Sequence, residues 1–277
     1  MIIRVPASSA NLGPGFDALG MALSIYADVG YCDDTPPTNA TIADDHHPAT
    51  IAFAMAGGTG RLWIRSSIPM GRGLGFSGAV RVAGVVAAHA QRHGDDPGAL
   101  HMARPDLLSI ASQLEGHPEN AAASLFGGVV ASSAGQTVRV PLAVQPSIIA
   151  WVPSIKTSTD RARSVLPDTV PFVDAVFNVG RTALLVASLA SGNLAALRVA
   201  TEDRLHQQQR LDGAGLSAAA LSAALATDAW AAWLSGSGPT VLVLCRPGTQ
   251  ESIIAAMPAE GKCWQLDVDS VGARVIH

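Results

Sequence analysis

The distribution of apolar positions along the chain predicts a mixture of strands and helices. Apolar and polar residues alternate over residues 21–31 and 61–66, which is typical of strands that bury one face. A long run of small and apolar residues at 77–92 predicts a helix that is buried on every side. The apolar run at 241–245 follows a glycine-rich turn and predicts a buried strand.

The remaining elements follow from shorter patterns and from turn residues. We expect helices at 49–56, 107–114, 119–125, 170–191, 194–208 and 250–257, an alanine-rich helix over 214–233, strands at 2–6, 129–132 and 147–152, one or two final strands, and loops at 7–20 and 33–48. Pro141 and Pro146 mark a boundary between two parts of this pattern. It predicts an α+β fold with two lobes, residues 1–147 and 148–277.

Composition and charge exclude several classes of protein. The 277 residues are 48% hydrophobic and 14% charged, which indicates an ordered globular protein. The net charge of −4 predicts no nucleic-acid partner, and the absence of a lysine-rich run argues against binding to an anionic membrane. The three cysteines are scattered and lack metal-binding spacing. Since the first residues also lack the apolar stretch of a signal peptide, we expect a cytoplasmic protein.

A glycine-rich turn leads directly into the buried helix at 77–92. It consists of Pro69, Met70, Gly71, Arg72, Gly73, Leu74, Gly75, Phe76, Ser77, Gly78 and Ala79. Glycines let the backbone approach a ligand closely, and the free N–H groups of a helix N-terminus bind anions, most often phosphate. The alternative is a turn in which Ser77 caps a buried helix. The only lysines, Lys156 and Lys262, lie outside any Walker-type loop, so an ATP site here would depend on backbone amides, the helix dipole and Mg²⁺.

Three other segments carry groups suited to ligand binding. The loop at 6–17 presents Asn11, with an amide donor and acceptor, and Asp17, with a charge for an ammonium group. Glu115 stands at a helix end and can hold Mg²⁺ directly or through water. A second glycine-rich turn, residues 235–240, can support the first around a shared ligand. The simpler alternatives are a tight loop with solvated side chains, a solvated helix end and an ordinary turn that enters a strand.

Two groups of charged residues lie in the second half of the chain. Arg161 and Arg163 can bind a carboxylate or phosphate through the planar guanidinium. Asp203, His206 and Arg210 are spaced by three and four residues, which predicts one face of a helix. A solvated basic turn and a solvent-facing helix surface are the respective alternatives.

The order of these segments resembles the GHMP small-molecule kinase superfamily. Pro69-x-x-x-Gly73-Leu74-Gly75-x-Ser77 before a helix and the Ser-Gly-Ser-Gly-Pro-Thr turn at 235–240 carry this resemblance. The homoserine kinase family is indicated by the segments Asn11–Asp17, Glu115–Asn120, Ser158-Thr159-x-x-Ala162-Arg163 and Asp203-x-Leu205-His206-x-x-x-Arg210. The resemblance extends over nearly the whole chain.

The resemblance implies a fold, a reaction and a nucleotide site. The fold is a ribosomal-protein-like N-terminal lobe with a left-handed crossover and a ferredoxin-like C-terminal lobe. The implied reaction transfers the γ-phosphoryl group of ATP to the side-chain hydroxyl of L-homoserine, in threonine biosynthesis. ATP would lie on residues 69–79, supported by Gly236, Ser237 and Gly238, and Ser77 and Glu115 would hold Mg²⁺.

The resemblance also implies roles for the residues around the amino acid. The implied contacts are Asn11, Asp17, Asn120, Arg163 and Arg210. Asp17 would take the ammonium group of the substrate and the arginines its carboxylate. Thr159 would lie near the attacking hydroxyl, so Thr159 and Asp17 are the candidate catalytic residues. A dedicated base is not required, because phosphoryl transfer depends chiefly on positioning and charge stabilisation, and we expect late proton loss to the phosphate.

Two departures from the family pattern keep alternatives open. Phe76 stands where the family usually has serine, and the stretch from 33 to 62 is shorter than expected. The alternatives are another GHMP kinase, acting on threonine, pantoate or a similar small alcohol, and a protein that binds a nucleotide or amino acid without catalysis. A homodimer is also compatible with the sequence.

Overall fold

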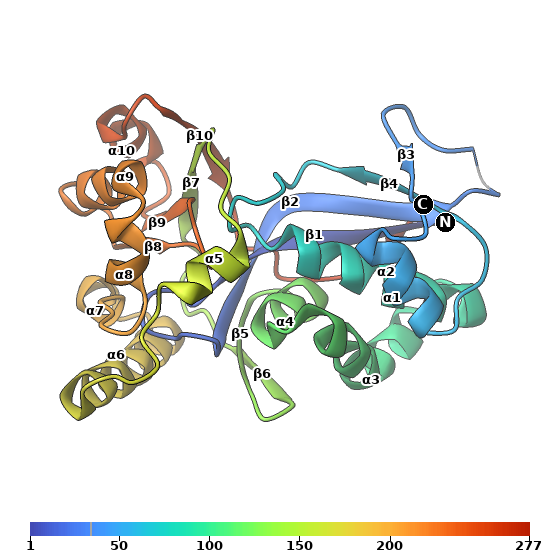
Figure 1. Cartoon of the computed structure of the whole chain (residues 1–277), viewed down its shortest axis with the longest axis horizontal. Helices are drawn as coiled ribbons and strands as arrows, with labels where there is room; N and C mark the ends of the chain where they lie inside the picture. The colour runs from blue at the N-terminus through green and yellow to red at the C-terminus, as the bar shows by residue number, and fades with distance from the viewer. Residues whose placement is uncertain (34) are drawn as a thin grey trace.

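The computed structural model describes residues 1–33 and 35–277 and arranges them in two lobes, each built on an antiparallel sheet (Figure 1). The first lobe contains β1 (Ile2–Ala10), β2 (Leu19–Tyr31), β3 (Thr41–Ile42), α1 (Pro48–Met55), β4 (Leu62–Ser66), α2 (Phe76–His93), α3 (Pro97–Glu115), α4 (Pro118–Phe126), β5 (Val129–Ser133) and β6 (Gln136–Val140). The second contains β7 (Ser147–Pro153), α5 (Thr159–Ser164), α6 (Phe172–Ser191), α7 (Leu194–Ala200), α8 (Gln207–Asp212), α9 (Gly215–Leu225), β8 (Ala231–Leu234), β9 (Val241–Cys245), α10 (Gln250–Ala256) and β10 (Gly261–Leu266). The predicted α+β fold is confirmed.

The first sheet has the strand order β11-β1-β2-β4-β3, where β11 is Arg274–Ile276. The long strand β2 pairs with β4 near one end and with β5 near the other, and β6 forms a hairpin with β5. Helices α1 to α4 lie together against this sheet (Figure 1). Because α2 is small and apolar on nearly all sides, it forms the centre of this layer, as the pattern at 77–92 predicts.

The second sheet has the strand order β10-β7-β9-β8, and its strands follow the β-α-β-β-α-β connectivity of a ferredoxin-like lobe. Trp151 and Val243 belong to a buried cluster that packs with residues of α9 and α10. The last strand, β11, leaves this lobe and pairs with β1, so the two termini lie side by side (Figure 1). The division at residue 147 therefore stays a prediction, since residues 274–276 complete the first sheet.

Two strands extend into segments predicted as loops. Strand β1 continues to Ala10 because residues 7–10 pair with residues 20–23 of β2 after a register shift. Its Ser8 and Ser9 are fully buried, and hydrogen bonds to other parts of the chain compensate for their burial. The short strand β3 pairs with β4 within the stretch predicted as a loop at 33–48.

Several helix predictions were also wrong at their boundaries. The predicted helix at 107–114 is the second half of α3, which begins at Pro97, is capped by Asp96 and continues through Pro105. The stretch 194–208 forms α7 and α8 with a break between them. The alanine-rich stretch 214–233 forms α9 and then β8, because pairing with β9 overrides the helix preference of alanine. Residues 159–164, for which no element was predicted, form α5.

Candidate active site

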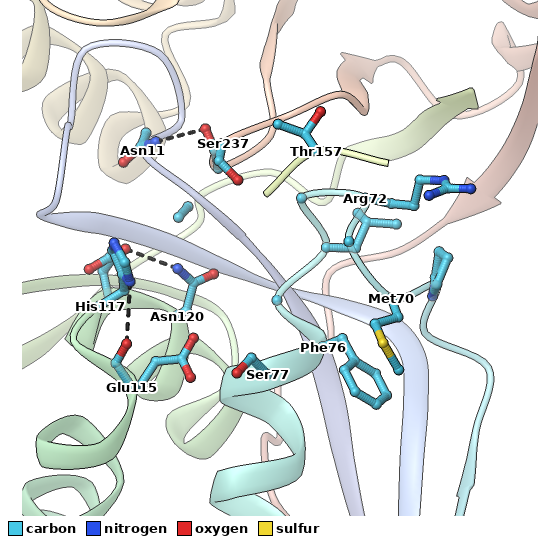
Figure 2. A pocket seen from close by; sticks show the side chains of 18 of the residues that line it. Asn11, Met70, Arg72, Phe76, Ser77, Glu115, His117, Asn120, Thr157 and Ser237 are labelled. Carbon is cyan, nitrogen blue, oxygen red and sulfur yellow. Dashed lines mark hydrogen bonds between the residues drawn. The ribbon is translucent and has the colours of Figure 1, made fainter. Parts of the chain in front are cut away.

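The glycine-rich turn lies between β4 and α2 and forms one wall of a cavity between the lobes (Figure 2). Gly71, Gly73 and Gly75 all have left-handed backbone conformations, with φ of 69°, 73° and 66°. A Cβ on Gly73 would lie 2.8 Å from the Gly238 carbonyl oxygen and closer still to that of Ser235. The left-handed conformation at every second residue therefore favours glycine, and at Gly73 it allows the turn to pack closely against residues 235–238.

Helix α2 begins at Phe76 with the left-handed Gly75 as its N-cap, and among the described residues no side chain caps it. The alternative in which Ser77 caps the helix was therefore wrong. Residues 69–77 line the cavity, whereas Gly78 and Ala79 are buried in the first turn of the helix. Phe76 packs against the hydrophobic core of the first lobe. The cavity thus meets a helix N-terminus, where N–H groups and the helix dipole favour an anion.

The second glycine-rich turn connects β8 to β9 and packs directly on the first. Ser235 Oγ donates a hydrogen bond of 2.6 Å to the Gly73 carbonyl oxygen, and the Gly236 N–H donates one of 3.2 Å to that of Ala10. Gly236 and Ser237 line the cavity, while Gly238 lines a neighbouring one. The two turns predicted to share a ligand are therefore in contact.

Asn11 and Asp17 project from the loop between β1 and β2, where both have positive φ. Asn11 is buried, and its amide is already used: Nδ2 donates to the Gly236 carbonyl oxygen at 3.1 Å and Oδ1 accepts from the Asp17 N–H at 3.1 Å. Asn11 thus joins the loop to the second glycine turn. The alternative of a loop with solvated polar side chains is wrong for Asn11.

Asp17, which lines the cavity, forms a two-point ion pair with Arg163. The guanidinium of Arg163 donates to Oδ1 at 3.2 Å and to Oδ2 at 2.5 Å. The side chains are 34% and 47% exposed, so both remain accessible to a solute. The two groups predicted to bind the ammonium and the carboxylate of an amino acid therefore neutralise each other.

Arg210 is buried beside this pair, and Phe16 links the two arginines. Arg210 Nε donates to the Ala162 carbonyl oxygen at 3.2 Å, and Nη1 donates to that of Gly236 at 3.0 Å. The guanidinium carbons of Arg163 and Arg210 both lie 5.3 Å from the centre of the Phe16 ring. Phe16 was not predicted as a site residue, and its only signal in the sequence is its position before Asp17.

The predicted helix face of Asp203, His206 and Arg210 does not exist as such. Asp203 and His206 precede α8, and the Asp203 carboxylate accepts the N–H groups of His206 and Gln207 at 2.9 and 2.7 Å. Burial acts to raise the pKa of Asp203, but His206 and these N–H groups hold it below its usual value. His206 is fully buried and its Nε2 lies 2.8 Å from the Gly13 carbonyl oxygen. These residues fix the 11–17 loop and position Arg210; the solvent-facing alternative is wrong.

Helix α6 supports the same loop. Asn178 Nδ2 donates to the Pro14 carbonyl oxygen at 3.1 Å and to Asp203 at 2.7 Å, and Thr182 also donates to Pro14. By length and composition α6 could cross a membrane, and it is the one described helix of which this is true. Its polar contacts show instead how it positions the loop that carries Asp17.

Glu119 and Asn120 lie at the start of α4 and line the cavity, and Figure 2 labels Asn120. Asn120 accepts from Ser8 Oγ at 3.0 Å and donates to Glu119 Oε1 at 3.0 Å. Glu119 is 1% exposed, and its Oε2 has no hydrogen-bond partner within the described part of the chain. Burial raises the pKa of Glu119 to about 7. Glu119 was not predicted as a site residue, because the burial of a carboxylate beside a turn cannot be recognised from neighbouring residues in the sequence.

Ser77 on α2 and Glu115 at the end of α3 are brought together, as the magnesium prediction requires. Both contact the Arg81 guanidinium, which lies between Ser77 Oγ and Glu115 Oε2. The Glu115 side chain is only 10% exposed, so the solvated-end alternative is wrong. Burial raises the pKa of Glu115, and Arg81 opposes this shift. A carboxylate and a hydroxyl are hard oxygen donors that fit Mg²⁺, with phosphate and water oxygens as its remaining ligands.

Thr159 is the first residue of α5, after the N-cap Ser158. Its side chain lies outside the described part of the structure, so its catalytic role stays a prediction. The threonine that lines the cavity is Thr157, whose N–H donates to the Gly71 carbonyl oxygen at 3.0 Å. Arg161 lines the neighbouring cavity.

Comparisons with known proteins assign the chain to a family. The GHMP kinases N terminal domain matches residues 46–128, and the GHMP kinases C terminal domain matches residues 187–263. The chain is 40% identical to a homoserine kinase of Streptomyces avermitilis, over 99% of this chain and 95% of that protein. It is 36% identical to a homoserine kinase of Desulfitobacterium hafniense, over 99% of each.

A solved structure supports the same assignment at the level of the fold. The crystal structure of homoserine kinase from Cytophaga hutchinsonii has a TM-score of 0.82 to this chain at 23% identity, over 100% of this chain and 97% of that one. Fold, motifs and full-length sequence similarity therefore agree, and the chain belongs to the homoserine kinase family of the GHMP kinases.

Proposed function

We propose that this chain transfers the γ-phosphoryl group of ATP to the side-chain hydroxyl of L-homoserine. The observation that carries the proposal is one cavity with two unlike walls. One wall is the glycine turn with the start of α2, and the other holds Asp17 and Arg210, with Arg163 paired to Asp17. The first wall suits a polyphosphate, and the second suits an amino-acid zwitterion.

The phosphates would lie on the backbone of residues 71–77. The N–H groups at the start of α2 supply donors and a positive dipole end, as in other helix-terminal phosphate sites. Because Phe76 packs against the core, its replacement of a serine removes a hydroxyl but keeps these amides. Ser77 and Glu115 would hold Mg²⁺, which would supply positive charge to the phosphates when bound.

The amino acid would enter by exchange of charged partners. Asp17 and Arg163 pair with each other. A zwitterion offers an ammonium group to Asp17 and a carboxylate to Arg163 and Arg210, so one internal ion pair is replaced by two pairs with the substrate. A substrate that carries only one of these charges would leave either Asp17 or the arginines without a counter-charge. This requirement favours an amino acid over pantoate.

Glu119 and Asn120 are suited to orient the acceptor hydroxyl. The unpartnered Oε2 of Glu119 can accept a hydrogen bond from that hydroxyl when the carboxyl is ionised, and Asn120 holds Oε1 in place. With a pKa of about 7, Glu119 can also take up a proton near neutral pH. Positioning and charge stabilisation would still dominate the reaction, as in other phosphoryl transfers.

A substrate comparison tests the proposal. Purified protein with ATP and Mg²⁺ should form ADP and a phosphorylated amino acid with L-homoserine, and much less product with L-threonine or pantoate. Preferred turnover of threonine or pantoate would indicate another GHMP kinase. Measurable ATP binding without turnover of any of the three would indicate a protein that only binds.

The proposed setting is a cytoplasmic enzyme without a nucleic-acid or membrane partner. The net charge of −4 supports the absence of a nucleic-acid partner. A homodimer remains part of the proposal, and sedimentation equilibrium of the purified chain would test it.

A further inference from the structure

Arg81 occupies the place where a cation would join Ser77 and Glu115. It lies one helical turn after Ser77 on α2, so its side chain extends along the face that meets the end of α3. One guanidinium nitrogen, Nη1, contacts both Ser77 Oγ and Glu115 Oε2. The Arg81 side chain is 22% exposed, so the contact is largely screened from solvent.

The two oxygens cannot serve Arg81 and a metal ion equally well at the same time. Arginine carries a permanent positive charge and only donates hydrogen bonds. Mg²⁺ binds its oxygen ligands at roughly 2.0–2.1 Å, so a guanidinium on the same lone pairs would be displaced. Two cations within a few ångströms of each other repel strongly where solvent screening is weak.

We propose that Arg81 is an internal competitor of the divalent cation: its guanidinium holds the Ser77–Glu115 pair in the metal-free protein and leaves it when the cation binds. This inference rests on the proposed function, in which Ser77 and Glu115 are the metal ligands. It adds a residue that sets how much metal the enzyme requires.

The surroundings of Glu115 explain what Arg81 contributes before metal arrives. Burial raises the pKa of Glu115, and the nearby positive charge of Arg81 works against that rise. Arg81 thus provides a counter-charge for the buried Glu115 carboxylate and keeps it beside Ser77. The same contact weakens metal binding. Its partial exposure gives the displaced side chain a route to solvent.

Manganese binding to the nucleotide-loaded protein tests this directly. Mn²⁺ is titrated against the protein in the presence of a non-hydrolysable ATP analogue, and free Mn²⁺ is measured by electron paramagnetic resonance. Arg81→Met should lower the dissociation constant for Mn²⁺ roughly tenfold or more, because a charge-assisted contact no longer has to be broken. Arg92→Met is the matched control: Arg92 is at the other end of α2 and donates to the Ala56 carbonyl oxygen, so Mn²⁺ binding should not change.

A third variant separates the two proposals. Glu115→Gln should weaken Mn²⁺ binding strongly if Glu115 is a metal ligand. Unchanged binding in Glu115→Gln would overturn the metal site itself, and with it the role of Arg81. Weakened binding in Glu115→Gln, together with unchanged or weaker binding in Arg81→Met, would overturn only the competition. Where Arg81→Met does not fold, as judged by circular dichroism, Arg81→Gln removes the same charge and carries the same expectation.

Discussion

The two walls of the cavity are built in different ways. The proposed nucleotide wall consists of backbone: three left-handed glycines, a helix start that no described side chain caps, and a second glycine turn that contacts the first. The proposed amino-acid wall carries charged side chains: Asp17 of the β1–β2 loop pairs with Arg163 of α5, and Arg210 of α8 donates to backbone carbonyl oxygens. The first wall is closely packed, since a Cβ on Gly73 or Gly75 would collide with neighbouring atoms, and the second carries charges that can exchange partners.

This difference predicts that mutations will act differently on the two walls. On the nucleotide wall, a single methyl group should displace the backbone and so harm catalysis without removing any functional group. On the amino-acid wall, a deleted charge should change affinity for one substrate and leave the fold intact.

The largest effect is expected for Gly73→Ala. The new Cβ would collide with the carbonyl oxygens of Ser235 and Gly238, so the two glycine turns must separate. A displacement of about 1 Å at a reacting group costs on the order of a hundredfold in rate, so kcat/KM for ATP should fall by at least that factor. Steady-state kinetics with varied ATP measures it.

Gly248→Ala is the control for Gly73→Ala, since Gly248 also has positive φ but nothing lies within 4 Å of its Cβ position. It should lose some stability and keep its kcat/KM. Equal kinetic losses in both variants would show that backbone strain, and not contact between the turns, limits the nucleotide wall.

The second effect concerns the stability of the protein and depends on Glu119, the buried carboxyl group proposed to face the acceptor hydroxyl. The pKa of Glu119 is 4.5 when unperturbed and about 7 when buried, so the folded protein binds more protons than the unfolded chain between these values. The free energy of unfolding should therefore fall as pH rises from about 4.5 to 7, by up to about 3 kcal/mol. Glu119→Gln should remove that loss, so its advantage over the wild type should be present at pH 8 and absent at pH 4.

Urea denaturation of wild type and Glu119→Gln at the two pH values measures this difference. Glu260→Gln, which changes an exposed carboxylate, is the control and should follow the wild type. A Glu119→Gln variant that is no more stable than the wild type at pH 8 would mean that the buried carboxylate is compensated by a partner, and the proposed role toward the acceptor hydroxyl would lose its basis.

The same contrast explains what could be predicted from the sequence. The nucleotide wall could be predicted from neighbouring residues in the sequence, because glycines at 71, 73 and 75 before an apolar helix indicate close backbone packing. The amino-acid wall depends on pairing between distant segments, so its residues could be named through family resemblance, but the Asp17–Arg163 pair could not be foreseen. Glu119 and Arg81 were missed because their importance comes from burial and from contacts across helices.

The errors in the fold have a similar cause. Residues 7–10 have only small or polar side chains and look like a loop, but they pair with β2 and are buried. The stretch 214–233 is rich in alanine and looks helical throughout, but its last residues complete a sheet. In both cases pairing with a distant strand outweighs the local conformational preference of the residues. A local sequence pattern contains no information about that pairing.

The most direct test of the two-wall account is the binding of both ligands to Arg163→Ala, measured by isothermal titration calorimetry. L-homoserine should bind roughly tenfold to a hundredfold more weakly, since a charged hydrogen-bonding partner of its carboxylate is lost. A non-hydrolysable ATP analogue should bind as to the wild type. Arg161→Ala, two residues earlier on α5, should leave both affinities unchanged. Weaker binding of the nucleotide analogue with unchanged binding of L-homoserine would contradict the account.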